Sequence, residues 1–125
     1  MMKMKGYTNI VKCLAVQGDH LVSGSWDKTI CKWNFKGECV AILKGHEHWV
    51  RSLAVSNNGI LFSGSHDNTI RVWNAFDECI QVLKDAGRVS ALKILDGKLF
   101  SASYDGTVRC WSGKILSFPF YHSHF

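Results

Sequence analysis

A serine, a histidine and an aspartate stand side by side at Ser65, His66 and Asp67, within the segment LFSGSHDNTIRVWN. These are the residue types of a hydrolytic triad, in which the histidine takes a proton from the serine and the aspartate orients the histidine. A triad is defined by geometry, because the imidazole must lie within hydrogen-bond reach of the hydroxyl. Neighbouring residues of a β-strand point to opposite faces, so Ser65 and His66 would point apart in a strand.

The same segment occurs three times, which allows the triad to be tested against its own copies. The copies read LVSGSWDKTICKWN (21–34), LFSGSHDNTIRVWN (61–74) and LFSASYDGTVRCWS (99–112). The position of His66 is Trp26 in the first copy and Tyr104 in the third. Neither an indole nor a phenol replaces imidazole as a general base. We therefore predict that the protein is not an enzyme; the alternative, a Ser-His-Asp hydrolase, would be labelled at Ser65 by serine-directed probes.

The elements around each copy indicate an all-β chain. An apolar run precedes each copy, VKCLAV from 11, VRSLAV from 50 and VSALKI from 89, and ECVAIL and ECIQVL follow the first two. These runs are rich in β-branched residues, are separated by Gly, Asn and Asp, and lack helical periodicity. Each unit therefore reads as four short strands. Both strand faces are apolar, which predicts sheets packed between neighbouring sheets.

A period near 40 residues, Gly45-His46 before a first strand and a tryptophan ending the third strand give the chain a family likeness. It resembles the WD-repeat β-propeller family, whose blades are four-stranded antiparallel sheets. The likeness covers nearly the whole chain, with units at about 6–44, 45–84 and 85–121 and an atypical tail at 113–125. Gly6-Tyr7 and the Asp85-Ala86 region stand where the outer units would carry Gly-His, and the Trp-Asp ending reads Trp-Asn or Trp-Ser.

The resemblance implies a tetrad of hydrogen-bonded side chains that fastens each blade. Its members are a histidine before the first strand, a serine in the second, the turn aspartate and the third-strand tryptophan. In the middle unit these are His46, Ser63 (with Ser65 as the alternative), Asp67 and Trp73. The equivalent aspartates and tryptophans of the other units are Asp27, Trp33, Asp105 and Trp111. An indole N–H needs a buried acceptor and a turn aspartate accepts backbone N–H groups, which supports the same assignment.

The resemblance also places a set of residues on the rim of one propeller face, where a partner would bind. They are the turn positions Trp26, His66 and Tyr104 and the positions at the start of each first strand, Ile10, Lys12, Trp49, Arg51, Arg88 and Ser90. Aromatic residues and arginine dominate binding energy at protein interfaces. We therefore expect a scaffold or adaptor that binds a protein or peptide through this rim, with the three turn positions facing the partner.

Arg51 suggests an alternative function, the binding of phosphorylated peptides in particular. It resembles a position where F-box WD-repeat receptors of ubiquitin ligases place arginines against phosphorylated peptides, and a guanidinium suits phosphate because it donates two parallel hydrogen bonds. The protein would then be the substrate-recognition part of a ubiquitin ligase or kinase assembly. Arg71 and Arg109 recur inside the third strand and read as structural residues.

Charge and motif content limit the classes of partner and cofactor that we expect. The 15 basic and 10 acidic residues give a net charge of +5, scattered along the chain, which favours acidic partners over nucleic acid. No phosphate-binding glycine motif occurs, the five cysteines form no CxxC pair, and the pairs at 46/48 and 122/124 have no third ligand at recognisable spacing. We expect no cofactor and no metal.

The lengths of the apolar runs and of the whole chain bear on localisation and on the number of blades. No run approaches the roughly 20 apolar residues that span a bilayer, so we expect a cytoplasmic protein, with the nucleus as an alternative. Propellers close with about four to eight blades, and this chain of 125 residues supplies about three. Either the chain is part of a longer one, or copies self-associate, two chains giving about six blades.

Overall fold

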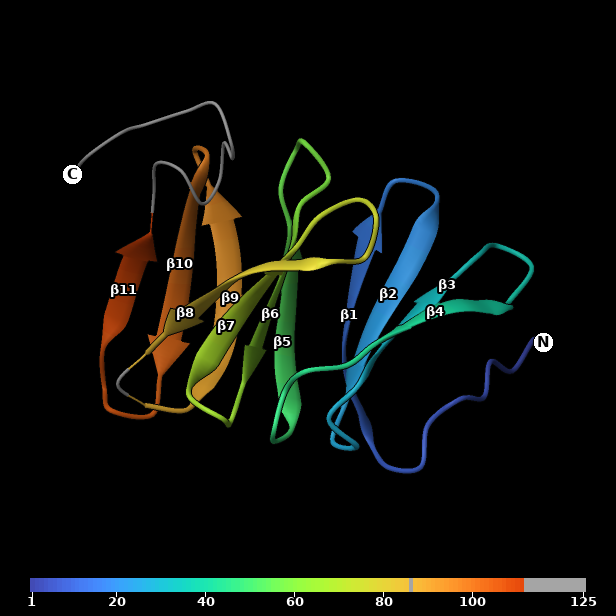
Figure 1. The fold of residues 1–125 in the computed structure, drawn as a ribbon, viewed down its shortest axis with the longest axis horizontal. Helices are drawn as coiled ribbons and strands as arrows, with labels where there is room; N and C mark the ends of the chain where they lie inside the picture. The colour runs from blue at the N-terminus through green and yellow to red at the C-terminus, as the bar shows by residue number, and fades with distance from the viewer. Residues whose placement is uncertain (86, 112–125) are drawn as a thin grey trace.

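Three antiparallel sheets lie side by side in chain order in the computed structural model (Figure 1). The structure describes residues 1–85 and 87–111. The first sheet holds β1 (Val11–Gln17), β2 (His20–Ser25), β3 (Ile30–Trp33) and β4 (Cys39–Leu43). The second holds β5 (Val50–Val55), β6 (Leu61–Ser65), β7 (Thr69–Trp73) and β8 (Cys79–Lys84). The third holds β9 (Val89–Leu95), β10 (Lys98–Ser103) and β11 (Val108–Trp111).

The predicted all-β architecture of four-stranded antiparallel sheets is confirmed for the first two units. Three strands of the third unit are described, and the predicted tail at 113–125 lies outside the described residues. Within the described part of the chain, no helix is long and apolar enough to cross a membrane.

The three sheets share one register, which explains why the sequence copies align so closely. Leu21 pairs with Trp33, Leu61 with Trp73 and Leu99 with Trp111. The turn between the second and third strands has positive φ one residue after its aspartate, at Lys28 (77°), Asn68 (71°) and Gly106 (84°). Each unit therefore delivers its serine, aspartate and tryptophan in the same relative positions.

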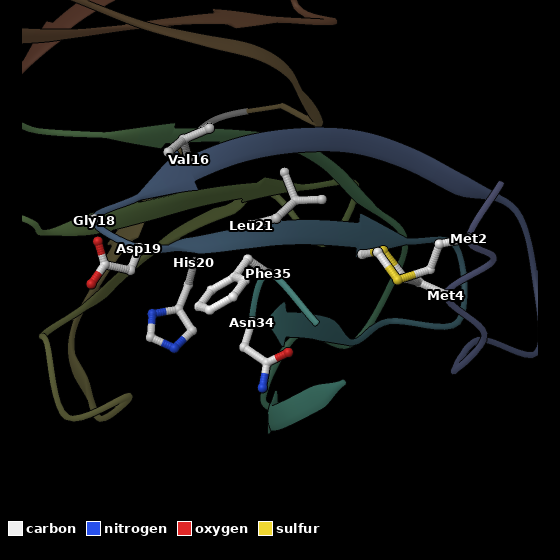
Figure 2. A pocket seen from close by; sticks show the side chains of 9 residues that line it. All are labelled: Met2, Met4, Val16, Gly18, Asp19, His20, Leu21, Asn34 and Phe35. Atoms are coloured by element: carbon white, nitrogen blue, oxygen red, sulfur yellow. The ribbon is translucent and has the colours of Figure 1, made fainter. Parts of the chain in front are cut away.

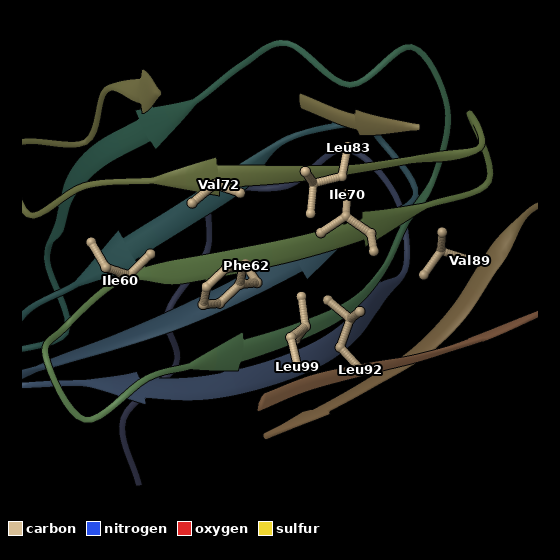
Figure 3. Close-up of a cluster of buried hydrophobic side chains, with 8 residues drawn as sticks. All are labelled: Ile60, Phe62, Ile70, Val72, Leu83, Val89, Leu92 and Leu99. Atoms are coloured by element: carbon tan, nitrogen blue, oxygen red, sulfur yellow. The ribbon is translucent and has the colours of Figure 1, made fainter. Parts of the chain in front are cut away.

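The sheets pack face to face, as the apolar strand faces predict. Phe62 and Ile70 of the middle blade pack with Val89, Leu92 and Leu99 of the third in one cluster of buried side chains, seen in Figure 3. A second cluster joins the first and middle blades. Its buried members are Val22, Ile30, Leu43, Val50, Leu53, Leu61 and Trp73. At each interface, the second, third and fourth strands of one blade therefore pack against the first and second strands of the next blade.

Two glycines set how closely the blades approach. A Cβ at Gly24 would lie 2.6 Å from Val50 Cγ1 of the next blade, and a Cβ at Gly64 would lie 2.6 Å from Val89 Cγ1. Both distances are far below van der Waals contact, so these positions in the SGS sequence require glycine. The third copy carries Ala102 here, on the face where no further blade is described.

The outer faces of the arc expose residues that are buried inside it. Leu14 is 62% exposed, whereas its register equivalent Leu53 is 8% exposed. At the other end Val108 is 71% exposed. Figure 2 shows part of the first outer face, where Met2, Met4, Val16 and Phe35 line one shallow pocket. Among the described residues, each end of the arc therefore presents one half of the blade interface that occurs twice inside it.

We predict that Leu53→Ala lowers the free energy of unfolding by about 2–5 kcal/mol, because it removes a buried side chain between two blades. The matched change Leu14→Ala, in the same register position of the first blade, is expected to cost about 0.5 kcal/mol or less at dilute protein concentration. Urea denaturation of both variants measures this difference. Equal losses at both positions in dilute protein would contradict the packing described above.

Candidate interaction site

One hydrogen-bonded chain of four side chains fastens the middle blade. His46 Nδ1 lies 2.9 Å from Asp67 Oδ2, and His46 Nε2 lies 2.7 Å from Ser63 Oγ. The indole of Trp73 donates to Ser63 Oγ at 2.9 Å. The structure thus brings together the four predicted side chains and selects Ser63 over Ser65. They tie the segment before β5 to the second and third strands.

The turn aspartate of this blade is held in its charged form. Burial acts to raise the pKa of Asp67, but the hydrogen bonds from His46 and Thr69 and from the N–H of Glu47 outweigh it. The pKa of the carboxyl therefore lies well below its usual range. Both carboxyl oxygens are used, since Oδ1 accepts from the N–H of Thr69 at 2.9 Å and Oδ2 from Glu47 at 2.9 Å.

The first blade replaces histidine by tyrosine at the equivalent position. Tyr7 donates its hydroxyl hydrogen to the Ser23 carbonyl and accepts from the N–H of Cys31 at 2.8 Å. Its oxygen lies 2.6 Å from Ser23 Oγ, to which Trp33 donates at 2.8 Å. Asp27 caps its own turn through Thr29 instead of bonding the tyrosine ring. The serine and indole are kept, and only the group before the first strand changes.

The third blade replaces histidine by an ion-pair bridge. Arg109 lies 2.6 Å from Asp85 and donates to Asp105 at 2.9 Å, so one guanidinium joins two carboxylates. Ser101 donates to Asp85 at 3.4 Å and accepts from Trp111 at 3.0 Å. The Arg109 guanidinium, first among several hydrogen bonds, holds the pKa of Asp105 well below its usual range. Arg109 thus has a structural role, as the sequence predicts. The sequence did not predict its two acidic partners, Asp85 and Asp105.

The adjacent Ser65, His66 and Asp67 do not form a triad in this structure. Ser65 Oγ accepts from the N–H of Asp67 at 3.0 Å and donates to the His48 carbonyl at 3.3 Å. Asp67 is bonded to His46 and not to His66. The hydroxyl therefore serves the turn, and the aspartate orients a different histidine.

At the rim, a repeated backbone hydrogen bond joins each turn to the segment before the first strand. The N–H of Trp26 donates to the Ile10 carbonyl at 2.9 Å, that of His66 to Trp49 at 3.0 Å, and that of Tyr104 to Arg88 at 2.9 Å. The predicted turn positions and strand-start positions are therefore neighbours in all three blades. Ser90 turns its hydroxyl into the third sheet, where it donates to the Ala102 carbonyl at 3.2 Å.

Four aromatic rings from the rim positions are in contact across the three blades. Trp26 and Trp49 stack with ring centroids 3.8 Å apart and planes 5° from parallel. Trp49 lies 5.2 Å from His66, and His66 meets the edge of Tyr104 at 5.1 Å. His48, which the sequence reading did not include in the rim, lies 5.6 Å from His66. Its position in the segment between Gly45-His46 and Trp49 is the sequence feature that could have placed it at the rim.

Burial divides these rim residues in a way that the sequence did not predict. Tyr104 is 55% exposed, but His66 is only 6% exposed. His66 therefore does not face solvent as expected, because the rings of Trp49, His48 and Tyr104 pack against it. Burial lowers the pKa of His66, and the nearby charges of Arg51, Arg88 and His48 lower it further.

Cationic side chains flank the aromatic rings. Lys12 Nζ lies 6.0 Å from the centroid of the Trp26 ring, at the outer limit for a cation–π contact. Arg51 and Arg88 act on His66 through their charge, and neither makes an ion pair or a side-chain hydrogen bond with another described residue. The rim thus combines large apolar rings with positive charge that the described chain leaves unneutralised.

A comparison with family models matches this chain to the WD domain, G-beta repeat, in three copies at residues 1–34, 37–74 and 77–112. The chain belongs to the WD40 repeat family. The second and third matches each contain the last strand of one sheet, β4 or β8, followed by the first three strands of the next sheet. The departures at Tyr7 and Asp85 are changes within WD40 blades.

Curated WD40 relatives match short parts of the chain. A stretch of 46 residues is 46% identical to nuclear distribution protein PAC1 of Mycosarcoma maydis and covers 36% of this chain and 10% of that protein. A stretch of 57 residues is 40% identical to a WD repeat-containing protein of Schizosaccharomyces pombe and covers 39% of this chain and 15% of that protein.

Solved WD40 structures match most of the fold. The RRP9 WD40 repeats superpose with a TM-score of 0.80 at 31% identity, over 86% of this chain and 35% of that chain. The β-propeller domain of Doa1 superposes with a TM-score of 0.80 at 26% identity, over 85% of this chain and 38% of that chain. This WD40 chain therefore spans little more than a third of those structures.

We predict that Asp67→Asn lowers the free energy of unfolding at pH 7 by about 1–3 kcal/mol, because the charged hydrogen-bond acceptor of the tetrad is lost. The folded-state pKa of Asp67 is depressed. Its stabilisation is therefore present above the unfolded value near 4 and is lost as pH falls towards the folded value. Urea denaturation between pH 7 and pH 3 should show the difference from the parent shrinking in acid.

The control for this prediction is Asp19→Asn, in the exposed β1–β2 turn. It is expected to change stability by about 0.5 kcal/mol or less at every pH. A loss at Asp67→Asn that stays constant down to pH 3 would show that the carboxylate charge does not fasten the blade.

Proposed function

We propose that this protein is a non-enzymatic interaction module that binds a segment of a partner protein across its rim. The observation that carries the proposal is the contact of the Trp26, Trp49, His66 and Tyr104 rings across three blades, flanked by unneutralised cations. WD40 domains generally act as protein-interaction scaffolds, which supports the same reading.

The rim has the chemistry of an interface. Large aromatic rings and arginines carry most of the binding energy at protein interfaces, where they are surrounded by contacts that exclude water. Trp26 and Trp49 are half-buried and Tyr104 is exposed, so part of each ring is open to a partner while its orientation is fixed by its neighbours. Fixed rings lose less conformational entropy on binding.

A second candidate is the recognition of phosphorylated or acidic peptides, as in a substrate receptor of a ubiquitin ligase or kinase assembly. The positive charge of Arg51 and Arg88 beside the rings favours it, since neither guanidinium has a carboxylate partner among the described residues. Guanidinium groups bind phosphate through paired hydrogen bonds.

The outer faces of the arc are proposed to pack against further blades of the same kind, from a longer chain or from a second copy. The two internal interfaces support this, because they bury the equivalents of the residues exposed at the ends. Cover by a second copy would make the cost of Leu14→Ala rise with protein concentration.

We predict that Tyr104→Ala lowers the capture of phosphorylated and unphosphorylated peptides alike by roughly tenfold, because a shared aromatic anchor is lost. Arg51→Ala should lower only the capture of phosphorylated peptides. Matched pairs of degenerate peptides, with a central serine or phosphoserine, measure both effects on the full chain. Phe76→Ala, which removes an 81% exposed ring away from the rim, is the control. Equal effects of Phe76→Ala and Tyr104→Ala would contradict the rim assignment.

A further inference from the structure

His66 is a buried imidazole whose hydrogen-bonding groups are not used within the described chain. The residue is 6% exposed, and neither Nδ1 nor Nε2 has a hydrogen-bond partner. A buried polar group without a hydrogen-bond partner destabilises the folded state. The copies at the same turn position, Trp26 and Tyr104, supply rings for the aromatic contacts as well. His66 therefore carries hydrogen-bonding groups that its ring contacts do not use.

The groups around His66 have a surplus of hydrogen-bond donors. The indole Nε1 of Trp26, on the other side of Trp49, is also buried without a partner, and an indole can only donate. The guanidiniums of Arg51 and Arg88 likewise only donate. Ligand atoms that satisfy these groups must be acceptors, and the positive charge selects acceptors that carry negative charge.

We propose that His66, with Arg51 and Arg88, forms a site for an anionic side chain of a bound partner, a carboxylate or a phosphate. His66 donates a hydrogen bond to the anion, and the two arginines neutralise its charge. This inference rests on the proposed function of the rim and specifies what the rim selects.

Tyr104 is the side chain that admits the anion. Its ring lies against His66 edge-on at 5.1 Å and is 55% exposed, which makes it the most exposed of the three rings that contact His66. The proposed site requires this ring to rotate away from the imidazole. Trp49 cannot play this role as easily, because it is stacked on Trp26. Binding therefore exchanges a ring contact for a hydrogen bond.

The site also couples binding to a proton. The charged and titratable groups facing His66 are Arg51 from β5, His48 before β5, Arg88 before β9 and Tyr104 after β10, and none supplies a negative charge. Burial and these cations lower the pKa of His66 in the free protein. A bound anion raises it again, so binding takes up a proton. Affinity for the anion should then increase as pH falls from 8 to 6.

Three degenerate peptide libraries with a fixed central glutamine, glutamate or phosphoserine test the site on the full chain. The parent should capture the glutamate or phosphoserine library roughly tenfold more than the glutamine library at pH 7, which corresponds to about 1.4 kcal/mol. Preference for phosphoserine alone identifies a phosphate ligand, and equal preference identifies any carboxylate or phosphate. His66→Phe keeps the aromatic ring and should abolish the preference while retaining glutamine-library capture. His20→Phe, in the β1–β2 hairpin, is the matched control.

The outcomes separate this inference from the proposed function. Capture of all three libraries to the same extent, or an unchanged preference in His66→Phe, overturns the anion site and leaves the binding function standing. Capture of none overturns both. The pH dependence is read on the glutamate library, whose carboxylate does not titrate between pH 6 and pH 8. A slope that persists in His66→Phe would also overturn the role of the imidazole.

Discussion

The bond between a serine hydroxyl of the second strand and the indole of the third-strand tryptophan is the constraint on which the whole arc depends. It recurs in every blade with nearly the same length, as Ser23–Trp33 at 2.8 Å, Ser63–Trp73 at 2.9 Å and Ser101–Trp111 at 3.0 Å. A buried indole N–H without an acceptor is destabilising, and in these three cases the serine supplies the acceptor from the adjacent strand. The hydroxyl then reaches outward to whichever group precedes the first strand. Register, turn and entry segment are fixed together.

The three blades meet this constraint with three chemistries, and the sequence predicted only one of them in full. His46 could be paired with Ser63, Asp67 and Trp73 because all four match one recognisable pattern. The positions of Tyr7 and Asp85 were correctly located by spacing, but their partners were not predictable. Tyr7 reaches a backbone N–H, and Asp85 needs Arg109 from another strand, so both depend on how the strands are placed in space.

The same limit applies to the rim. Spacing placed the turn and strand-start positions beside one another, because a repeated unit repeats its backbone hydrogen bonds. It did not predict that His66 is buried, since that burial comes from rings contributed by neighbouring blades. Because the position of His66 varies between the copies, it was predicted to face a partner. His66 is instead an enclosed polar group in contact with the more exposed Tyr104. The segment that first suggested catalysis thus separates into a structural serine and aspartate and a histidine enclosed by the aromatic rings of the rim.

Hydrogen–deuterium exchange at the five indole N–H groups tests the fastening bond most directly. We expect slow exchange at Trp33, Trp73 and Trp111 in the parent protein, because each indole is bound to its serine. Ser63→Ala should accelerate exchange at Trp73 by at least tenfold while leaving Trp33 and Trp111 nearly unchanged. Fast exchange at Trp73 in the parent, or no acceleration in Ser63→Ala, would contradict the account.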